Sequence, residues 1–398
     1  AGFFVPVILI ISLLTFFIWV FFGGIDVVSH GLFAALSVLV VACPCAVGLA
    51  TPVALAAGLN KAARNHILIR DTSALEQMRN VDVVVFDKTG TLTEGHPTVI
   101  GWLWAQGQEE HYKDVLLAAE STSDHPLAEA IVTALEGEEQ VIPAHLDGFE
   151  NITGKGVRVA YQGAEYWVGS HKLLKDYQAN LSDILADMLT QYESDGNSIV
   201  YFGRENDLLA VIAIKDQLRV TSMEAIRELR IQDIEICMLT GDGERTASSV
   251  AGSLGIMRFV ADAMPDDKED FIHKLQLQGK TVAMVGDGVN DAQALSCADV
   301  SIAMGKGTDT LMDTAMITLR TSDLLLLPKV FRLSRQTVSL MYRNLFWAFI
   351  YNTVGIFVAA GVLYPVYDIL LSPALAGAAM ALSCVSVALS SLRLSSRF

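Results

Sequence analysis

Charged side chains are missing from four long stretches of the chain. No Asp, Glu, Lys or Arg occurs in residues 1–24, 31–60, 344–367 and 369–392. Each stretch is longer than the ~20 apolar residues that cross the ~30 Å hydrocarbon core of a bilayer. These stretches exclude an ordinary soluble enzyme. They predict four membrane-spanning helices around an aqueous segment at about residues 61–343.

Basic residues are also scarce: 28 Lys and Arg stand against 44 Asp and Glu, and the net charge is −16. Because a nucleic-acid backbone needs a basic footprint, this balance excludes nucleic acid as a partner. The loops at residues 25–30 and around Asp368 contain no Lys or Arg, and the basic residues lie at the opposite ends of the predicted spans. The positive-inside rule then places the aqueous segment and the C-terminus in the cytoplasm, and we expect a multi-pass protein of the plasma (inner) membrane, in contact with lipid.

Cysteine is too rare for a disulfide framework. The five cysteines are odd in number and lie mostly within apolar runs. The first apolar stretch has no basic segment before it and no cleavage signal, so it is not a signal peptide. Because residue 1 is Ala, we expect the chain to begin partway through a longer protein.

Four short runs rich in Val and Ile are typical of buried parallel strands. They lie at residues 81–86, 234–239, 281–285 and 299–303. Helical patterns such as residues 244–254 and 268–278 separate the later runs. This alternation predicts a doubly wound parallel-sheet α/β domain in the aqueous segment.

Residues 87–233 separate the first two runs, far more than a crossover needs, and therefore contain a domain of their own. Helical patterns at residues 112–119 and 126–135 precede strand-like alternation at 156–161 and 198–202, which predicts a small α+β insert. The expected organisation is two membrane helices at 1–69, the α/β domain at 70–98 and 207–327, the insert at 99–206, and two membrane helices at 328–398.

Polar clusters follow the predicted strands where doubly wound sheets place their sites. These clusters are Asp87, then Thr240-Gly241-Asp242, then Asp287 with Asn290 and Asp291, while Lys268 lies on the helix between the last two. One such cluster is as easily a turn, but their repetition at successive strand ends indicates an active site. A carboxylate can attack the γ-phosphate of ATP and hold it as an acyl phosphate.

Phosphoryl transfer also needs positive charge against the phosphate oxygens. We expect the Asp87 and Asp287 carboxylates and the Thr89 carbonyl to hold Mg²⁺, with Asp291 in support. The Lys268 ammonium and the Thr240 hydroxyl are expected to bind phosphate oxygens.

The motif Asp87-Lys88-Thr89-Gly90-Thr91 resembles the phosphorylation motif of the P-type ATPases of the haloacid dehalogenase superfamily, and Thr240–Asp242, Lys268 and Gly286–Asp291 resemble their later motifs. The resemblance covers essentially the whole chain and implies that Asp87 forms the aspartyl phosphate. Gly243 departs from the Asn usual in the family. No Thr-Gly-Glu occurs, so we expect the family's actuator domain to lie upstream and this fragment to turn over poorly.

The insert contains Glu120, Ser123-Asp124-His125-Pro126 and Gly154-Lys155-Gly156. Taken alone, these residues are more often a helix start and a turn. In the insert of a P-type ATPase they resemble the adenine pocket of the heavy-metal subfamily. This resemblance implies that His125 orients ATP and that Glu120, Gly154 and Gly156 line the pocket, while Ser170 departs from the usual Asn.

Cys43-Pro44-Cys45 lies within an uncharged predicted span. Positions i and i+2 of a helix point about 200° apart, but Pro44 removes a backbone donor, which can let both sulfurs face one ion. Thiolates prefer soft ions such as Cu(I) or Zn²⁺. The two remaining spans hold no carboxylate, and two thiolates already balance a monovalent ion, which favours Cu⁺ or Ag⁺.

The membrane residues resemble the copper class of heavy-metal P-type ATPases. That class pairs Cys-Pro-Cys with Tyr-Asn, here Tyr351-Asn352, and with Met-x-x-Ser-Ser, here Met380 and Ser383. Phe357 and Cys384 depart from the class, and Cys384 is either packing or an additional ligand. The resemblance implies ATP-driven export of Cu⁺ or Ag⁺, with Mg²⁺ as cofactor and a cytosolic copper chaperone as a candidate partner.

Three alternatives remain. A Zn(II)/Cd(II)-type pump is expected to carry a membrane Asp. A membrane-anchored phosphatase of the same superfamily needs a second acid where this chain has Thr89, and a non-catalytic metal-binding protein is expected to lose Asp87, Lys268 or Asp287, all of which are present.

Overall fold

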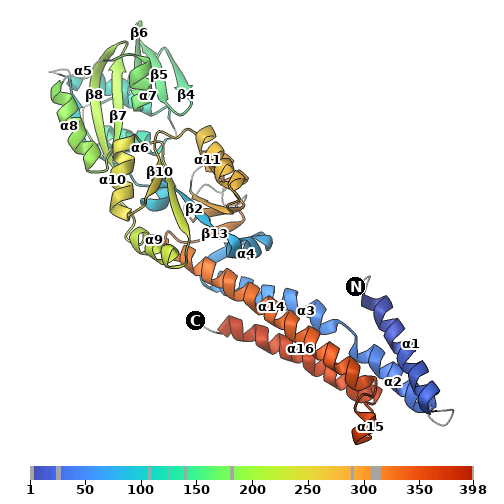
Figure 1. The fold of residues 1–398 in the computed structure, drawn as a ribbon. Helices are drawn as coiled ribbons and strands as arrows, with labels where there is room; N and C mark the ends of the chain where they lie inside the picture. Colours follow the sequence, from blue (N-terminus) through green and yellow to red (C-terminus); the bar gives the residue numbers. More distant parts are fainter. Residues whose placement is uncertain are drawn as a thin grey trace. The chain divides into compact units, whose positions relative to one another are not determined.

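The structure is a computed structural model that describes residues 4–23, 28–105, 109–123, 125–138, 141–179, 183–287, 291–305 and 315–396. The chain divides into two compact units, drawn as ribbons in Figure 1. The helical unit comprises Ala1–Asn65 and Val330–Phe398, and the α/β unit comprises His66–Lys329. The α/β unit thus begins a few residues before the predicted boundary at residue 70, because the short strand β1 (Ile67–Ile69) pairs within its sheet.

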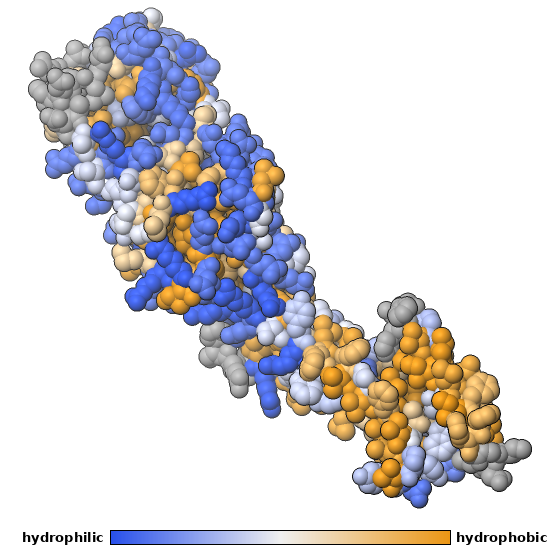
Figure 2. All heavy atoms as spheres, in the orientation of Figure 1, coloured by the Kyte–Doolittle hydropathy of each residue, from blue (hydrophilic) through white to orange (hydrophobic). Residues whose placement is uncertain are grey.

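The helical unit consists of helices whose surface in Figure 2 is largely hydrophobic. Its elements are α1 (Phe4–Gly23), α2 (Val28–Val41), α3 (Cys45–Arg64), most of α14 (Leu326–Ala359), α15 (Tyr364–Tyr367) and α16 (Pro373–Ser396). Among the described residues, the segments long and apolar enough to cross a membrane are 5–22, 28–64 and 373–394.

The predicted span at residues 344–367 differs from the structure. These residues begin inside α14, whose helix ends at Ala359, and Gly361 then adopts a φ of +93° before the short helix α15. A left-handed glycine is a common way for a helix to end. The segment therefore does not form one continuous helix, and α14 is not among the three candidate spans.

Small residues allow the helices of this unit to pack closely. Ala46 and Ala50 of α3 share a buried cluster with Ala348 of α14 and Val387 of α16. A buried hydrogen bond of 2.9 Å from Asn344 Nδ2 to Ser391 Oγ also joins α14 to α16. Such interhelical polar contacts satisfy groups that lipid cannot.

A seven-stranded sheet organises the α/β unit, in the order β1-β13-β12-β11-β2-β9-β10. Its remaining strands are β2 (Val83–Asp87), β9 (Glu235–Leu239), β10 (Arg258–Val260), β11 (Val282–Gly286), β12 (Val300–Met304) and β13 (Ile317–Leu319). The four strands predicted from the sequence are adjacent and parallel, which confirms the doubly wound domain. Only β1 pairs antiparallel to its neighbour among the described strands of this sheet.

Helices connect these strands, as the alternation in the sequence predicts. They are α4 (Ser73–Gln77), α9 (Ser222–Ile231), α10 (Glu244–Leu254), α11 (Pro265–Leu277) and α12 (Ala292–Cys297). Residues from β2, β9, β11, α11 and α12 share one buried apolar cluster. The carboxyl ends of β9, β2 and β11 consequently lie side by side.

The insert is a six-stranded antiparallel sheet with four helices. The strand order is β3-β8-β7-β6-β5-β4. The strands are β3 (Thr98–Trp104), β4 (Gly148–Ile152), β5 (Gly156–Tyr161), β6 (Ala164–Gly169), β7 (Ser198–Arg204) and β8 (Asp207–Lys215), and the helices are α5 (Glu109–Glu120), α6 (Pro126–Glu136), α7 (His171–Asp176) and α8 (Asp183–Ser194). Because β8 pairs with both β3 and β7, the insert's sheet extends to Lys215, beyond the predicted boundary at residue 206.

Candidate active site

Asp87 is the last residue of β2, in the middle of the seven-stranded sheet. Val83, Val84, Val85 and Phe86 before it are completely buried. Parallel pairing with β9 and β11 places the ends of three strands around its carboxylate. The Asp87 side chain is therefore held at the sheet edge by a strand that is paired on both sides.

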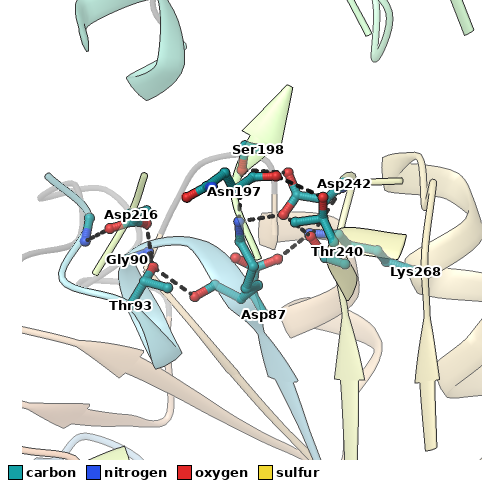
Figure 3. A network of polar contacts seen from close by, with 12 residues as sticks. Asp87, Gly90, Thr93, Asn197, Ser198, Asp216, Thr240, Asp242 and Lys268 are labelled. Carbon is teal, nitrogen blue, oxygen red and sulfur yellow. Dashed lines mark hydrogen bonds and ion pairs between the residues drawn. The ribbon is translucent and has the colours of Figure 1, made fainter. Parts of the chain in front are cut away.

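Lys268 connects two of the predicted acidic residues. Its Nζ donates a hydrogen bond of 2.5 Å to Asp87 Oδ1 (Figure 3) and another of 2.7 Å to Asp291 Oδ1. All three side chains are buried. The lysine projects from the first turn of α11. Burial by itself lowers the pKa of Lys268, but the charges of Asp87 and Asp291 raise it above its ordinary value, so the ammonium stays protonated.

Three carboxylates converge beside this lysine. The ligand atoms of Asp87, Asp287 and Asp291 all lie within 4.8 Å of one another. Burial and the negative charges of Asp87 and Asp291 raise the pKa of Asp287 to about 7. This excess of negative charge, on oxygen ligands alone, fits a hard divalent cation such as Mg²⁺.

Asp87 is followed by a loop that only glycine can complete. Gly90 has a φ of +70°, and its backbone lies against the Asp287 carboxylate. Thr93 Oγ1 accepts a hydrogen bond of 3.0 Å from the Gly90 N–H and lies 3.1 Å from the Lys88 carbonyl. Thr89, the predicted carbonyl ligand, lies half-buried in this loop.

Residues after β8 clamp the same loop. Arg219 donates to the carbonyl of Thr91 at 3.0 Å and also to the carbonyl of Gly90. Asp216 accepts from the Gly95 N–H at 3.1 Å and pairs with the Thr93 hydroxyl. Sequence reasoning missed these residues. The available signal was an arginine shortly after an apolar strand. The sequence alone does not show whether such an arginine is buried or lies at the surface.

Lys88 contacts Asp242 and Ser198, whereas Lys268 contacts Asp87 and Asp291. Lys88 forms a buried ion pair with Asp242, and its Nζ donates a hydrogen bond of 3.1 Å to Ser198 Oγ (Figure 3). Ser198 in turn donates to Asp242 Oδ1 at 2.8 Å, and Thr240 Oγ1 accepts from the Asp242 N–H at 3.1 Å. Burial opposes ionisation of Asp242, yet Lys88 and these hydrogen bonds lower its pKa. Gly241 is exposed between Thr240 and Asp242.

Ser198 opens β7, so this network joins the insert to the seven-stranded sheet. Two further hydrogen bonds connect the same surfaces: Thr246 Oγ1 to the Asn197 carbonyl at 2.7 Å, and Lys172 Nζ to the Asp262 carbonyl at 2.5 Å. The contribution of Ser198 to the site was not predicted, because a single serine at a strand start carries no sequence signal.

The predicted nucleotide residues lie on the insert. His125 precedes α6, and its Nδ1 accepts a hydrogen bond of 3.2 Å from the Leu127 N–H. Desolvation lowers the pKa of His125, although the residue is exposed at the surface, and the negative charge of Asp242 opposes this shift. The charges of Asp242, Lys88 and Asp87 therefore act on the imidazole of His125.

Glu120 and the two glycines occupy distinct environments. Glu120 ends α5 with 6% of its surface exposed, and burial raises its pKa to about 8. Gly154 has a φ of +69°, and a Cβ there would meet Met264. Gly156 lies against Gly169 at the pairing of β5 with β6. Ser170 Oγ is buried and has no hydrogen-bond partner.

The membrane thiols lie at a break between helices. α2 ends at Val41 and α3 begins at Cys45, with Pro44 before its first turn, as predicted for the Cys-Pro-Cys sequence. Cys43 is half-buried and Cys45 is exposed, and Cys384 of α16 packs against the cluster that contains Ala46, the neighbour of Cys45 in the chain. Among the described residues, Cys43, Cys45 and Cys384 do not form a group whose ligand atoms all lie within 4.8 Å of one another.

The other predicted copper ligands differ in their exposure. Asn352 is buried in α14, whereas Tyr351 is 48% exposed and stacks on Trp347. Met380 and Ser383 of α16 are half-buried, and Ser383 Oγ has no hydrogen-bond partner. Asn290, the remaining predicted catalytic residue, lies outside the described residues, and so does Asp124 of the insert motif.

A family model described as haloacid dehalogenase-like hydrolase matches residues 81–299. A copper-exporting P-type ATPase of Legionella pneumophila is 43% identical over 99% of this chain and 53% of that protein. A silver exporting P-type ATPase of Salmonella typhimurium is 44% identical over 100% of this chain and 48% of that protein. The chain thus spans about half the length of these curated relatives.

Solved structures of ATPases are also similar to this chain. A zinc-transporting PIB-type ATPase in the E2.Pi state has a TM-score of 0.70 at 32% identity, over 98% of this chain and 62% of that chain. The catalytic domain of the CPx-ATPase CopB-B has a TM-score of 0.57 at 28% identity, over 68% of this chain and 96% of that chain. The chain therefore belongs to the haloacid dehalogenase-like hydrolases and, within them, to the P-type ATPases.

Proposed function

We propose that this chain is the catalytic and C-terminal membrane part of a pump that uses ATP to export Cu⁺ or Ag⁺. The observation that carries the proposal is the convergence of Asp87, Asp287 and Asp291 around Lys268 at the ends of adjacent parallel strands. A turn or a helix cap does not require four charged groups in one place. Phosphoryl transfer to a carboxylate does.

In the proposed reaction, an Asp87 carboxylate oxygen attacks the γ-phosphorus of ATP. A new phosphorus–oxygen bond forms, the bond to the β-phosphate oxygen breaks, and ADP leaves. Lys268 holds Asp87 in place before the attack and carries positive charge toward the phosphoryl oxygens. Water later attacks the aspartyl phosphate, which releases inorganic phosphate and restores the carboxylate.

Mg²⁺ would neutralise phosphate charge when bound, and the Asp87, Asp287 and Asp291 oxygens are its proposed ligands, with the Thr89 carbonyl. The pKa of Asp287, raised to about 7 by burial and by its acidic neighbours, supports a divalent cation here. Thr240 is proposed to donate to a phosphate oxygen when its hydrogen bond to Asp242 opens.

We propose that ATP binds between the insert and the seven-stranded sheet. His125, Glu120, Gly154 and Gly156 are the proposed contacts with the nucleotide, and the unpartnered Ser170 hydroxyl is available beside them. Lys88, the residue after Asp87, forms an ion pair with Asp242 and a hydrogen bond with Ser198 of the insert. In the proposal, this contact rearranges when the triphosphate binds.

The proposed transport ligands are Cys43, Cys45, Asn352, Met380 and Ser383, with Tyr351 after a rotation of its side chain. A membrane site built from thiolates favours a soft monovalent ion. Relatives named copper- or silver-exporting, at 41–44% identity, support this choice over the zinc-transporting structure at 32%. The α/β unit is proposed to face the cytoplasm of the plasma membrane, where a chaperone could deliver the ion.

The test is phosphorylation of the purified chain in lipid, with Mg²⁺ and ATP labelled in its γ-phosphate. We expect acid-stable, hydroxylamine-sensitive label that Cu⁺ or Ag⁺ increases. Asp87→Asn should abolish the label, and the exposed Asp207→Asn should leave it unchanged. Cys43→Ser with Cys45→Ser should remove the metal dependence alone.

Two results would contradict the proposal. Stimulation by Zn²⁺ but not by Cu⁺ would reassign the transported ion. Label that survives Asp87→Asn would place the phosphoryl group elsewhere and end the aspartyl-phosphate mechanism.

A further inference from the structure

A second group of metal-binding side chains lies on the α/β unit, apart from the three active-site carboxylates. It consists of Glu269 and His273 on α11 and Cys297 at the end of α12. Their ligand atoms all lie within 4.8 Å of one another. None of these residues contributes to phosphoryl transfer or to the membrane thiol site.

The spacing of these atoms matches tetrahedral coordination. Cys297 Sγ is 3.4 Å from Glu269 Oε1, and His273 Nε2 is 3.5 Å from the same oxygen. Zn²⁺ bonds of ~2.0–2.3 Å at tetrahedral angles place neighbouring ligand atoms about 3.3–3.8 Å apart. Two of the three separations therefore already have the required length. Glu269 and His273 are four residues apart, so they share one face of α11.

A neighbouring glutamine orients the imidazole. Gln276 Nε2 donates a hydrogen bond of 2.9 Å to the Cys297 carbonyl, so its oxygen faces His273 Nδ1 at 3.1 Å. Because an amide oxygen only accepts, Nδ1 carries the proton of the neutral ring. Nε2 then directs a lone pair at the Glu269 carboxylate. A metal-binding histidine is commonly fixed in this way by an acceptor at its other nitrogen.

Two acceptors and a thiol thus meet at one point on the surface. The side chains of Glu269 and His273 are 35% and 50% exposed, so an ion can reach them from solvent. A thiolate, a carboxylate and a neutral imidazole together carry two negative charges. This balance matches a divalent ion of intermediate softness better than Cu⁺ or Mg²⁺.

We propose that Glu269, His273 and Cys297 form a Zn²⁺ site with one coordination position open to solvent. On binding, Zn²⁺ takes the place of the Cys297 thiol proton, which leaves to solvent. The ion links α11 to α12. Lys268 precedes Glu269 on α11, and Asp291 directly precedes α12. Lys268 is hydrogen-bonded to both Asp291 and Asp87. The ion would therefore restrain the segments that carry two active-site groups.

The experiment uses the full chain with Cys43→Ser and Cys45→Ser, so that the membrane thiols do not bind metal, and with Mg²⁺ in excess to occupy the active-site carboxylates. Zn²⁺ is titrated in competition with a chromophoric chelator. We expect one tightly held Zn²⁺ per chain, and its affinity should fall by about 100-fold or more with His273→Gln or Cys297→Ser. His145→Gln, an exposed histidine of the insert, should change nothing.

Co²⁺ gives an independent readout, because a thiolate ligand produces an intense charge-transfer absorption. That absorption should appear in the parent and in His145→Gln and vanish in Cys297→Ser. Glu269→Gln should weaken Zn²⁺ binding and keep the thiolate absorption. This variant tests the site even if Cys297→Ser does not fold. Unchanged Zn²⁺ affinity in His273→Gln, or Cu⁺ binding at Cys297 without Zn²⁺ binding, would overturn the site.

Discussion

The Asp287 carboxylate lies directly against the backbone of Gly90. A Cβ atom built on Gly90 would be 1.5 Å from Asp287 Oδ2, closer than any side chain tolerates. The two residues are almost two hundred positions apart, yet the carboxyl ends of β2 and β11 bring them into contact. The loop after Asp87 therefore needs its glycine both for the turn and for the approach of a proposed metal ligand.

Gly90→Ala is expected to disable phosphorylation while the chain still folds. Alanine at a φ of +70° costs about 1–2 kcal/mol, and its Cβ would push Asp287 out of place. Because a displacement of ~1 Å can cost about 100-fold in rate, we expect at least that loss in label transferred to Asp87. Gly243→Ala is the matched control, since a Cβ atom at that position would have no other atom within 4 Å. Equal activity in the two variants would contradict this reading of Gly90.

Divalent-cation affinity should depend on pH through Asp287. Its pKa is raised to about 7, so the carboxyl is increasingly protonated below pH 7 and ionised above it. A proton then competes with the ion, and affinity should fall by about tenfold per pH unit below 7. Mn²⁺ titration followed by electron paramagnetic resonance measures this slope. Asp287→Asn should bind weakly at every pH, and an unchanged slope in that variant would assign the proton to another group.

Arg219→Gln should loosen the loop that follows Asp87. The guanidinium donates to the carbonyls of Gly90 and Thr91, and its charge lowers the pKa of Asp287. We expect phosphorylation to fall by roughly 10–100-fold and the midpoint of Mn²⁺ binding to move to higher pH. Exposed Arg227→Gln on α9 serves as control. A loss of activity with no movement of the midpoint would mean that Arg219 acts only on the loop.

Nucleotide binding should weaken in mild alkali because of Glu120. Burial raises its pKa to about 8, so the neutral acid predominates at pH 7 and the carboxylate appears as the pH rises through 8. Ionisation places a negative charge near the proposed nucleotide, and affinity should fall by up to about tenfold per pH unit above 8. Isothermal titration with ADP from pH 7 to 9 measures this effect. Glu120→Gln should bind ADP as tightly as the parent does at pH 7, and its affinity should not fall above pH 8. A fall in affinity that persists in this variant would exclude Glu120 as its source.

Cys384 gives a choice between packing and ligation. It packs beside Val387 and beside Ala46, which follows Cys45 in the chain. If it is a ligand, Cys384→Ser should weaken Cu⁺ binding by about tenfold or more, whereas Cys384→Ala and Cys384→Ser should be alike if it only fills space. Competition with a Cu⁺ chelator measures the affinity. We expect the serine variant to bind more weakly, and unchanged affinity would assign Cys384 to packing.

Sequence reasoning succeeded where local pattern and chemistry agree. The run before Asp87 is continuous Val and Phe because both faces of β2 are covered, and this pattern alone identified a parallel strand. The break at Pro44 followed from the missing backbone donor of proline. Asp287 could be assigned to the same site as Asp87 because strand ends in such sheets meet at one edge.

Other features depended on contacts between distant segments. The insert ends at Lys215 because β8 pairs with both β3 and β7. Arg219 can donate a hydrogen bond to the Gly90 carbonyl because the chain after β8 lies beside the loop that follows Asp87. The exposed Tyr351 beside the buried Asn352 likewise reflects helix packing that a polar pair in an apolar run does not reveal.

By itself, the sequence determined the chemical groups: a carboxylate after a buried strand, a lysine at a helix start and two thiols around a proline. The tertiary structure alone decided how those groups are held and what else lies beside them, from the serine that joins the insert to Lys88 to the Glu269, His273 and Cys297 cluster. The physical reason is range. Strand periodicity and proline geometry act over a few residues, whereas hydrogen bonds and metal-ligand distances depend on atoms that only folding brings together.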